Sequence, residues 1–323
     1  MSPLIRPTTI MLYSDSGGTK TTQSYFLIKD IYKKTKKKFR IIMSDGGGIA
    51  PFADAGMIGT AVDVFDFSNR QHALADLRKL SLGYWPRWIT KDNKLYSSYT
   101  DGTQEYFRKE DVCMTTPDEW KGIAGYLIEG MTSTGSSLMS HCANQDATNK
   151  IGFKGSFIYE EDGFVFGGVD KGHYNIIQKE VYDRHTKGFS TLPMEWLIWT
   201  ALVGKGEDRE RITVFGPQLA GSAKTAEIPS WFHHCLHINK ERYVDVPTKL
   251  NTSANGQEKE GYVLWFQKHT NGQDGVPYLA KIRLLPELVP KLMEYCPYGF
   301  FPVTYTYGLD TFFKLLERIK TNK

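Results

Sequence analysis

Cysteine is scarce in this 323-residue chain, and its spacing matches neither a disulfide framework nor a zinc site. The four cysteines lie far apart and form no Cys-x-x-Cys pair: Cys113, Cys142, Cys235 and Cys296. Paired cysteines staple small secreted domains or hold structural zinc, whereas isolated thiols are typical of a reducing compartment. We therefore predict free thiols, and neither a disulfide scaffold nor a zinc ribbon.

Long apolar runs are also missing. None reaches the roughly 18 residues that a membrane-spanning helix needs. Residues 1–13 lack the basic and apolar stretches and the small-residue cleavage site of a secretory signal. The sequence therefore predicts a cytoplasmic protein with no membrane partner.

An excess of one charge is absent as well. Lys and Arg number 40 against 36 Asp and Glu, which gives a formal net charge of +4, and hydrophobic residues make up 41% of the chain. This composition is typical of a folded globular protein and excludes a disordered chain. So mild a surplus does not identify a nucleic-acid binder, because such binding depends on how charges cluster.

Strand-like and helix-like segments alternate in the first part of the chain. Glycine loops and helical periodicities, such as that of residues 25–32, separate apolar runs at 10–13, 39–43, 62–67 and 123–128. This order is typical of an α/β fold in which helices connect the strands of a mainly parallel sheet. Residues 195–200 predict another central strand, and residues 70–80 and 309–320 predict helices.

The pattern changes after residue 210. Short alternating stretches at 262–267 and 278–283 flank the turn signal Thr270-Asn271-Gly272-Gln273-Asp274-Gly275, which predicts a hairpin. We therefore predict a core over residues 1–210, with an irregular aromatic insertion at about 84–116, and a β-hairpin-rich C-terminal extension over residues 211–323 that continues the core.

The first predicted strand runs into a glycine loop that opens a helix at Lys20 and Thr21. This is the context of a Walker A phosphate loop. Its backbone N–H groups can wrap the phosphates of ATP, the lysine can reach the β- and γ-phosphates, and the threonine hydroxyl can hold Mg²⁺. The residues assigned to the nucleotide are Ser16, Gly17, Gly18, Thr19, Lys20, Thr21 and Thr22.

The loop departs from the pattern G-x-x-x-x-G-K-[ST], because Ser14 and Thr19 occupy both signature glycine positions. The glycine before the lysine allows a close backbone approach, so Thr19 favours a distorted cradle that binds nucleotide without hydrolysing it efficiently. The alternative is a polar loop in which Thr21 or Ser16 caps the helix.

Two acidic residues follow predicted strands. Ligands of open parallel sheets lie at the carboxyl ends of the strands. Glu129, after residues 124–128, is predicted to hold the Mg²⁺ shell, and Asp45, after residues 41–44, to orient or deprotonate the attacking water. The alternatives are a solvated strand end for Glu129 and a turn former for Asp45.

These motifs resemble those of the RecA-like P-loop ATPases of bacteriophages, the group that includes the Sak-type single-strand-annealing ATPases. The resemblance spans nearly the whole chain and rests on the phosphate loop and on residues 44–47, 126–133, 173–178, 199–201, 215–217 and 278–284. It implies a RecA-like P-loop NTPase core that uses ATP and Mg²⁺. It also implies homo-oligomers with nucleotide sites between subunits, in the host cytoplasm or in the virion.

The resemblance also implies roles for three further residues. Thr200, at the tip of the strand predicted over 195–200, is implied to sense the γ-phosphate. Lys281 and Arg283 are implied to reach a neighbouring subunit's nucleotide and to stabilise the transferred charge, as an arginine finger does. The alternatives are a strand-end threonine and an edge strand with salt bridges.

Two basic regions bear on a polymer partner. Five lysines fall within residues 33–38 at a predicted helix end, where they either complement the helix dipole or contact nucleic-acid phosphates. Between residues 84 and 108, aromatic and basic residues interleave, a composition that suits single-stranded DNA as well as core packing. The histidines at 233, 234 and 237 lack a second ligand pair at suitable spacing, so we predict no metal site there.

Together these patterns predict a protein that binds and hydrolyses ATP and acts on single-stranded DNA in recombination or replication. Two alternatives remain: a non-enzymatic nucleotide-binding protein that builds or assembles the virion, and a DNA-packaging or helicase-like motor. The fold alone does not choose between them, because one fold serves many functions.

Overall fold

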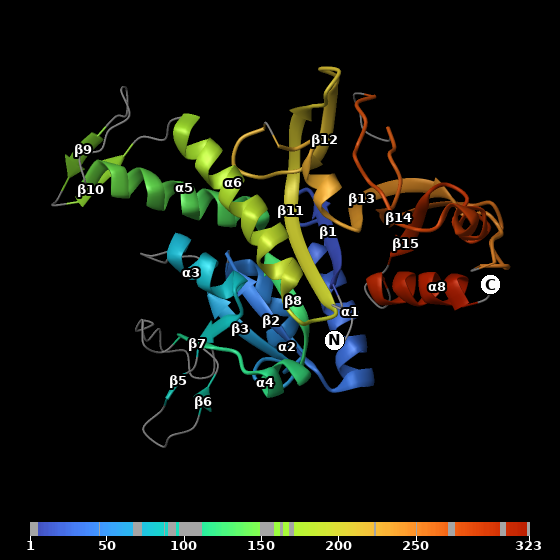
Figure 1. The fold of residues 1–323 in the computed structure, drawn as a ribbon. Coiled ribbons are helices and arrows are strands. Elements are labelled where there is room, and N and C mark those ends of the chain that lie inside the picture. The colour runs from blue at the N-terminus through green and yellow to red at the C-terminus, as the bar shows by residue number, and fades with distance from the viewer. Residues whose placement is uncertain are drawn as a thin grey trace.

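A large central sheet organises the fold in this computed structural model (Figure 1). The residues that the structure describes are 6–44, 46–66, 73–86, 88–89, 95–96, 112–148, 158–161, 164–167, 171–222, 224–249, 251–270, 275–303 and 308–321. The nine-stranded sheet has the order β15-β14-β13-β1-β11-β8-β2-β3, and β12 also pairs with β11. Its strands are β1 (Thr8–Ser14), β2 (Lys38–Met43), β3 (Val62–Asp66), β8 (Ile123–Glu129), β11 (Trp196–Glu207), β12 (Thr213–Pro217), β13 (His234–Val244), β14 (Glu258–Trp265) and β15 (Phe300–Val303).

Helices and short two-stranded sheets surround the central sheet. The helices are α1 (Lys20–Thr35), α2 (Ala50–Asp54), α3 (Ala73–Ser81), α4 (Pro117–Lys121), α5 (Met131–Thr148), α6 (Lys171–Lys187), α7 (Val289–Met293) and α8 (Leu309–Thr321). The short strands pair as β4 (Tyr84–Pro86) with β7 (Val112–Met114), β5 (Trp88–Ile89) with β6 (Leu95–Tyr96), and β9 (Ile158–Glu161) with β10 (Phe164–Gly167). Within the described ranges, no helix combines the length and the apolar character needed to cross a membrane.

Six neighbouring strands, β13, β1, β11, β8, β2 and β3, run parallel. Every residue of β8 is buried, and so are all residues of β1 after the first, as expected for strands covered on both faces. The predicted fold class is confirmed in its architecture: the protein is a mixed α/β fold with a mainly parallel central sheet and additional antiparallel strands.

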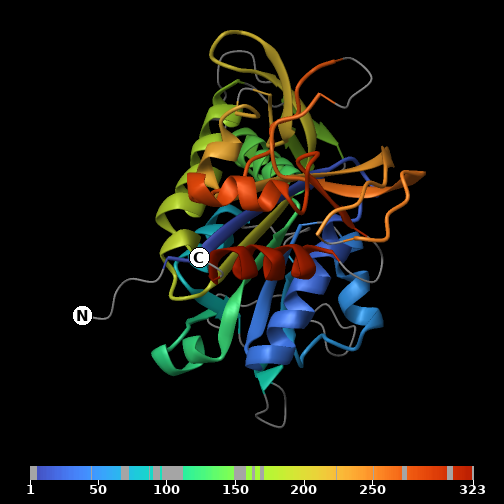
Figure 2. The ribbon, with the colours of Figure 1, turned by 90° about the vertical axis from the view of Figure 1, so that its right-hand side faces the viewer.

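The two faces of the sheet carry separate hydrophobic cores, because successive side chains of a strand point to opposite faces. Ile10 and Leu12 pack with α1, α2, α7 and α8. Met11 and Tyr13 pack with α3, α5 and α6. Figure 1 shows α5 and α6 on one side of β11 and α8 on the other, and Figure 2 shows α8 next to α1.

The strand predicted over residues 195–200 is longer than expected. Leu202 of β11 lies opposite Ser14, the last residue of β1, and β11 then continues to Glu207 while it pairs with the antiparallel strand β12. The resulting hairpin extends beyond the carboxyl end of β1, as the yellow strands of Figure 1 show. At about 3.3 Å per residue, the five additional residues carry it roughly 16 Å past the carboxyl end of β1.

The hairpin predicted over residues 262–267 and 278–283 is present only next to its turn, where His269 and Tyr278 exchange two backbone hydrogen bonds (2.8 and 3.3 Å). The strand pairing predicted for residues 262–267 is wrong, because β14 pairs with β13 and β15. Both edges of β14 are therefore occupied. A bridge at Lys281 attaches residues 278–283 to Cys235 of β13, a strand that runs parallel to β1 over residues 234–237.

A buried arginine fixes the insertion to the core. Arg40 of β2 is 5% exposed and donates to the hydroxyls of Thr115 (2.6 Å) and Tyr126 (2.9 Å). Its guanidinium also lies over the rings of Trp85 and Trp120. Thr115 in turn donates to the carbonyl of residue 83, so the two ends of the insertion meet at Arg40. Most of residues 87–111, with the interleaved basic and aromatic residues, lie outside the described residues.

Much of the lysine cluster has acidic neighbours. Lys34 pairs with Asp30, Lys37 pairs with Glu195 across the fold, and Lys38 pairs with Asp63. Lys33 and Lys34 lie in the last turn of α1, where cations are favourable against the helix dipole. Most of this charge is therefore balanced within the chain, which favours the structural interpretation of the cluster.

Candidate functional site

The predicted phosphate loop connects the carboxyl end of β1, at Ser14, to the first residue of α1, Lys20. The N–H of Gly18 donates to the carbonyl of Asp15 (3.1 Å) and closes a turn. Gly17 has a φ of +76°, which a residue with a side chain rarely adopts. The strand, the turn and the helix that the sequence predicts are therefore all present.

Ser14 and Gly18 fit each other. A Cβ atom at residue 18 would lie 2.2 Å from Ser14 Oγ and 2.5 Å from Ser14 Cβ, so no larger residue fits while Ser14 is in place. The serine at the first signature position is accommodated because a glycine stands four residues later. The serine at position 14 is visible in the sequence, but the space that Gly18 leaves for it is visible only in the structure.

Thr19, the other exception, has a left-handed backbone with φ 63° and ψ 10°. For a residue other than glycine, this conformation costs about 1–2 kcal/mol. Its hydroxyl oxygen is buried, with no hydrogen-bond partner among the described residues, and makes no cap for α1. The distortion predicted at this position is therefore a local backbone strain directly before Lys20.

The Lys20 side chain folds back over the loop. Its ammonium donates to the hydroxyl of Ser14 (2.9 Å), the carbonyl of Asp15 (3.0 Å) and the carbonyl of Ser14 (3.3 Å). Ser14 is 1% exposed, so its two contacts with Lys20 are partly buried, whereas the contact with Asp15 is exposed. Ser16 is exposed on the outer side of the loop, and Thr22 is half-buried in the first turn of α1.

Thr21, the residue after Lys20, contacts Glu129, so the structure brings two predicted site residues together. The hydroxyl of Thr21 donates to Glu129 Oε1 over 2.6 Å. One strand, β11, separates β1 from β8, so the two strands lie roughly 10 Å apart. The first turn of α1 bridges that gap. The interpretation of Thr21 as a helix cap is wrong, because its hydroxyl is directed at Glu129.

Glu129 is buried, with 4% of its surface exposed, so its interpretation as a solvated strand end is wrong. The glycine run after β2 makes room for it: a Cβ at Gly48 would lie 2.3 Å from Glu129 Cγ. A run of three glycines after a strand indicates a close approach of the backbone to another group. That signal could have placed Gly48 in the site. Asp45, directly before this run, lies outside the described residues.

Thr200 is not at a strand tip, because β11 continues beyond it to Glu207. The prediction was wrong about the end of the strand because β12 supplies a partner that prolongs β11 past the parallel sheet. The Thr200 side chain is fully buried, and its Oγ1 accepts a hydrogen bond from the N–H of Gly130 (2.8 Å). It therefore holds the turn that directly follows Glu129.

Lys281 and Arg283 lie away from the phosphate loop of their own chain. Lys281 is bound through its backbone to Cys235, and burial lowers the pKa of its ammonium. Burial lowers the pKa of His233, and Arg283 and Lys281 lower it further. The His233 ring bonds Thr9 near the amino end of β1, opposite the phosphate loop. Neither cation forms an ion pair with a carboxylate in the part of the chain that the structure describes.

A stack of buried rings lies beside the loop. His237 stacks on Tyr13, the residue before Ser14, and on Tyr278, and its Nδ1 lies 2.9 Å from Nε2 of His269. Burial lowers the pKa of His237 well below its ordinary value, and the nearby His269 and Lys20 lower it further. Burial also lowers the pKa of His269, to about 4. No three His, Cys, Asp or Glu side chains of the described ranges are grouped to hold a metal ion.

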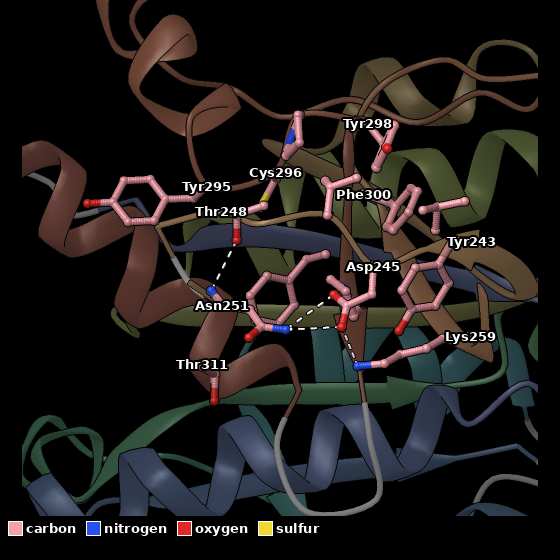
Figure 3. Close-up of a pocket in the computed structure, with 15 residues that line it drawn as sticks. Tyr243, Asp245, Thr248, Asn251, Lys259, Tyr295, Cys296, Tyr298, Phe300 and Thr311 are labelled. Atoms are coloured by element: carbon pink, nitrogen blue, oxygen red, sulfur yellow. Dashed lines mark hydrogen bonds and ion pairs between the residues drawn. The ribbon is translucent and has the colours of Figure 1, made fainter. Parts of the chain in front are cut away.

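A separate cavity of about 330 Å³ lies in the C-terminal part of the chain (Figure 3). Tyr243, Phe300 and Tyr298 contribute aromatic walls. On its polar side, Asp245 accepts hydrogen bonds from Asn251 (3.1 and 3.2 Å) and from Lys259. These bonds organise the connection between β13 and β14. None of the site residues predicted from the sequence lines this cavity.

No protein-family model matches the chain, and no curated protein matches it. Among solved structures, the chain is similar to the crystal structure of a KaiC-like protein from the hyperthermophilic archaeon Pyrococcus horikoshii OT3. The TM-score is 0.36 at 8% sequence identity, and the match covers 80% of this chain and 78% of the other.

Proposed function

We propose that this protein binds ATP with Mg²⁺ at the loop from Ser16 to Thr22 and hydrolyses the ATP. The observation that carries the proposal is the 2.6 Å hydrogen bond from the Thr21 hydroxyl to Glu129. It joins the helix start after a phosphate-type loop to a buried carboxylate at the carboxyl end of β8, a parallel strand separated from β1 by β11. In open α/β sheets, ligands bind at the carboxyl ends of the strands.

The residues present fit Mg²⁺. Threonine and glutamate oxygens are ligands of the kind this ion prefers, and Mg²⁺ at phosphate sites uses one or two carboxylates together with substrate phosphates. Thr21 and Glu129 are thus assigned to hold the ion. When bound, Mg²⁺ would neutralise charge that develops on the phosphates during transfer.

Other residues of the chain are proposed to bind the phosphates, to sense the γ-phosphate and to orient the attacking water. The first N–H groups of α1 and those of the glycine loop bind phosphate oxygens, and Lys20 exchanges its loop contacts for the β- and γ-phosphates. Thr200 keeps Gly130 in place after Glu129 and is the proposed sensor of the γ-phosphate. Asp45 is the proposed group that orients the attacking water.

The test is the stability of the fold with and without ATP and Mg²⁺. A ligand at about 100 times its dissociation constant adds roughly 2.7 kcal/mol to the free energy of unfolding. We expect a thermal-shift experiment to show this gain in the wild type and to show none in Lys20→Ala. A wild-type protein whose melting temperature does not respond to nucleotide would contradict the proposal.

The wider role is also a proposal. We infer that the ATPase works as a homo-oligomer on single-stranded DNA, in recombination or replication of a bacteriophage, either in the host cytoplasm or in the virion. Neither Lys281 nor Arg283 forms an ion pair with a carboxylate among the described residues, which leaves both cations available for a neighbouring subunit's nucleotide. The core of residues 1–210 and the continuation of residues 211–323 would then both contribute to each site.

The intersubunit role makes turnover depend on self-association. An arginine finger is worth on the order of 10³–10⁵ in rate. We therefore expect the specific ATPase activity to rise with protein concentration, and mixtures of Arg283→Ala with Lys20→Ala chains to regain activity at mixed interfaces. A flat specific activity over a series in which light scattering shows only monomer would remove both cations from the site.

A protein that binds the nucleotide without hydrolysing it is the second candidate. The strained Thr19, directly before Lys20, favours it, because this residue replaces the glycine that allows close phosphate approach. Such a protein would keep the ATP-dependent gain in stability and would show no phosphate release in a turnover assay.

A further inference from the structure

The side chain of Ser14 sits at the base of the phosphate loop between two polar partners. Its hydroxyl donates to the carbonyl of Asp15 (2.8 Å) and accepts from the ammonium of Lys20 (2.9 Å). Because its single hydroxyl proton is directed at Asp15, its lone pairs are left to face the lysine. The hydroxyl is therefore oriented as an acceptor for Lys20.

This contact depends on the identity of residue 14. Lys20 also donates to the carbonyls of Ser14 and Asp15, but backbone carbonyls are present whatever the side chains are. A glycine at this position, as in the consensus pattern, has no side-chain group that could hold the lysine. The missing Cβ of Gly18 leaves the space that the Ser14 side chain fills.

The location of the contact strengthens it. Ser14 is 1% exposed, and a hydrogen bond from an ammonium group in such a setting is stronger than the same bond in water. Lys20 cannot reach nucleotide phosphates and also keep all three of its loop contacts. Binding therefore includes the cost of breaking the bond to Ser14.

We propose that the Ser14 hydroxyl is a positioning group that holds Lys20 against the loop and so weakens the affinity of the site for the phosphates of ATP. The proposal rests on the ATP site proposed above and adds a determinant of its affinity. Ser14 makes no contact with the nucleotide in this account. It acts only through Lys20.

The test combines two measurements on Ser14→Ala, which removes the hydroxyl and keeps the Cβ. We expect the dissociation constant of ATP with Mg²⁺, from calorimetry, to fall roughly three- to tenfold. Without nucleotide, we expect an amine-reactive reagent to label Lys20 several times faster at fixed pH, as measured by mass spectrometry. The second readout reports on the lysine itself and would not change if Ser14 only supported the backbone.

A double-mutant cycle separates the lysine from other effects. In a Lys20→Ala background, Ser14→Ala should leave the residual affinity for ATP unchanged, because the hydroxyl then has no partner to hold. The matched control is Ser81→Ala, which removes a buried serine hydroxyl bonded to the carbonyl of Arg78 on α3 and should change neither readout. If Ser14→Ala does not fold, Ser14→Gly, which restores the consensus residue, takes its place.

The failures of the two proposals are distinguishable. An ATP affinity that is unchanged or weaker in Ser14→Ala overturns the role of Ser14 while the ATP site stands. An equal effect with and without Lys20 also overturns it. If the wild type binds no ATP, the ATP site is wrong, and an unchanged labelling rate of Lys20 then overturns the role of Ser14 as well.

Discussion

The free energy of unfolding is expected to fall by several kcal/mol when the pH is lowered from 7 to 5. Four nearly fully buried histidines carry this effect. Burial is the largest cause in each: it lowers the pKa of His185 and of His269 to about 4, that of His234 to about 3, and that of His237 well below the ordinary value. In the unfolded chain these groups return to a pKa of about 6.5.

The sign follows from proton uptake. Below about pH 6.5 the unfolded chain binds protons that the folded chain does not, so stability is fully present above that pH and falls as the pH drops toward 4. Each pH unit costs about 1.4 kcal/mol per histidine, which gives roughly 2 kcal/mol for each group at pH 5. The four groups together lose roughly 8 kcal/mol, which lies within the roughly 5–15 kcal/mol that stabilises a typical domain.

Urea unfolding at several pH values measures this effect. His185 is a useful probe because its Nε2 lies 3.0 Å from the carbonyl of Trp231, and an amide can replace that donor. We expect His185→Gln to lose roughly 2 kcal/mol less than the wild type between pH 7 and pH 5. Equal wild-type stability at the two pH values would show that these histidines are not held neutral by the fold.

Glu129→Gln is expected to keep ATP binding and to lose at least about 100-fold in turnover. The amide is isosteric with the carboxylate and can still bond the Thr21 hydroxyl, so the loop and the helix start remain in place. It lacks the negative charge that holds the Mg²⁺ shell. The effect should therefore appear in kcat and much less in the dissociation constant of ATP.

The control for Glu129 is a carboxylate away from the site. Glu258, exposed at the start of β14, should tolerate the same change to glutamine with unchanged turnover. Phosphate release under saturating ATP and Mg²⁺ is the measurement for both variants. Hydrolysis by Glu129→Gln at the wild-type rate would remove Glu129 from the site and assign the magnesium role to another acidic residue.

Local patterns predicted the parallel core well. Apolar runs bounded by glycine loops mark β1, β2, β3 and β8, and helical spacing marks α1, because these signals depend on neighbours within a few residues. The partner that a strand chooses is a non-local property. The sequence therefore did not show that β12 prolongs β11, or that β14 pairs with β13 and β15.

The candidate site was predictable in part for the same reason. The position of the phosphate loop follows from a strand, glycines and Lys20 in order, and Glu129 follows from its place at a strand end. The fit of Gly18 to Ser14 and of Gly48 to Glu129 depends on close approaches that only the folded backbone creates. The roles of Asp45, Lys281 and Arg283 stay predictions.

The most direct test of the ATP site is a calorimetric titration of ATP into the protein with Mg²⁺ and with a chelator. The account predicts one Mg²⁺-dependent site per chain in the wild type and binding at least about a hundredfold weaker in Lys20→Ala. It predicts unchanged binding in Lys33→Ala, a matched lysine change further along α1. No binding by the wild type, or equal affinity in the wild type and in Lys20→Ala, would contradict it.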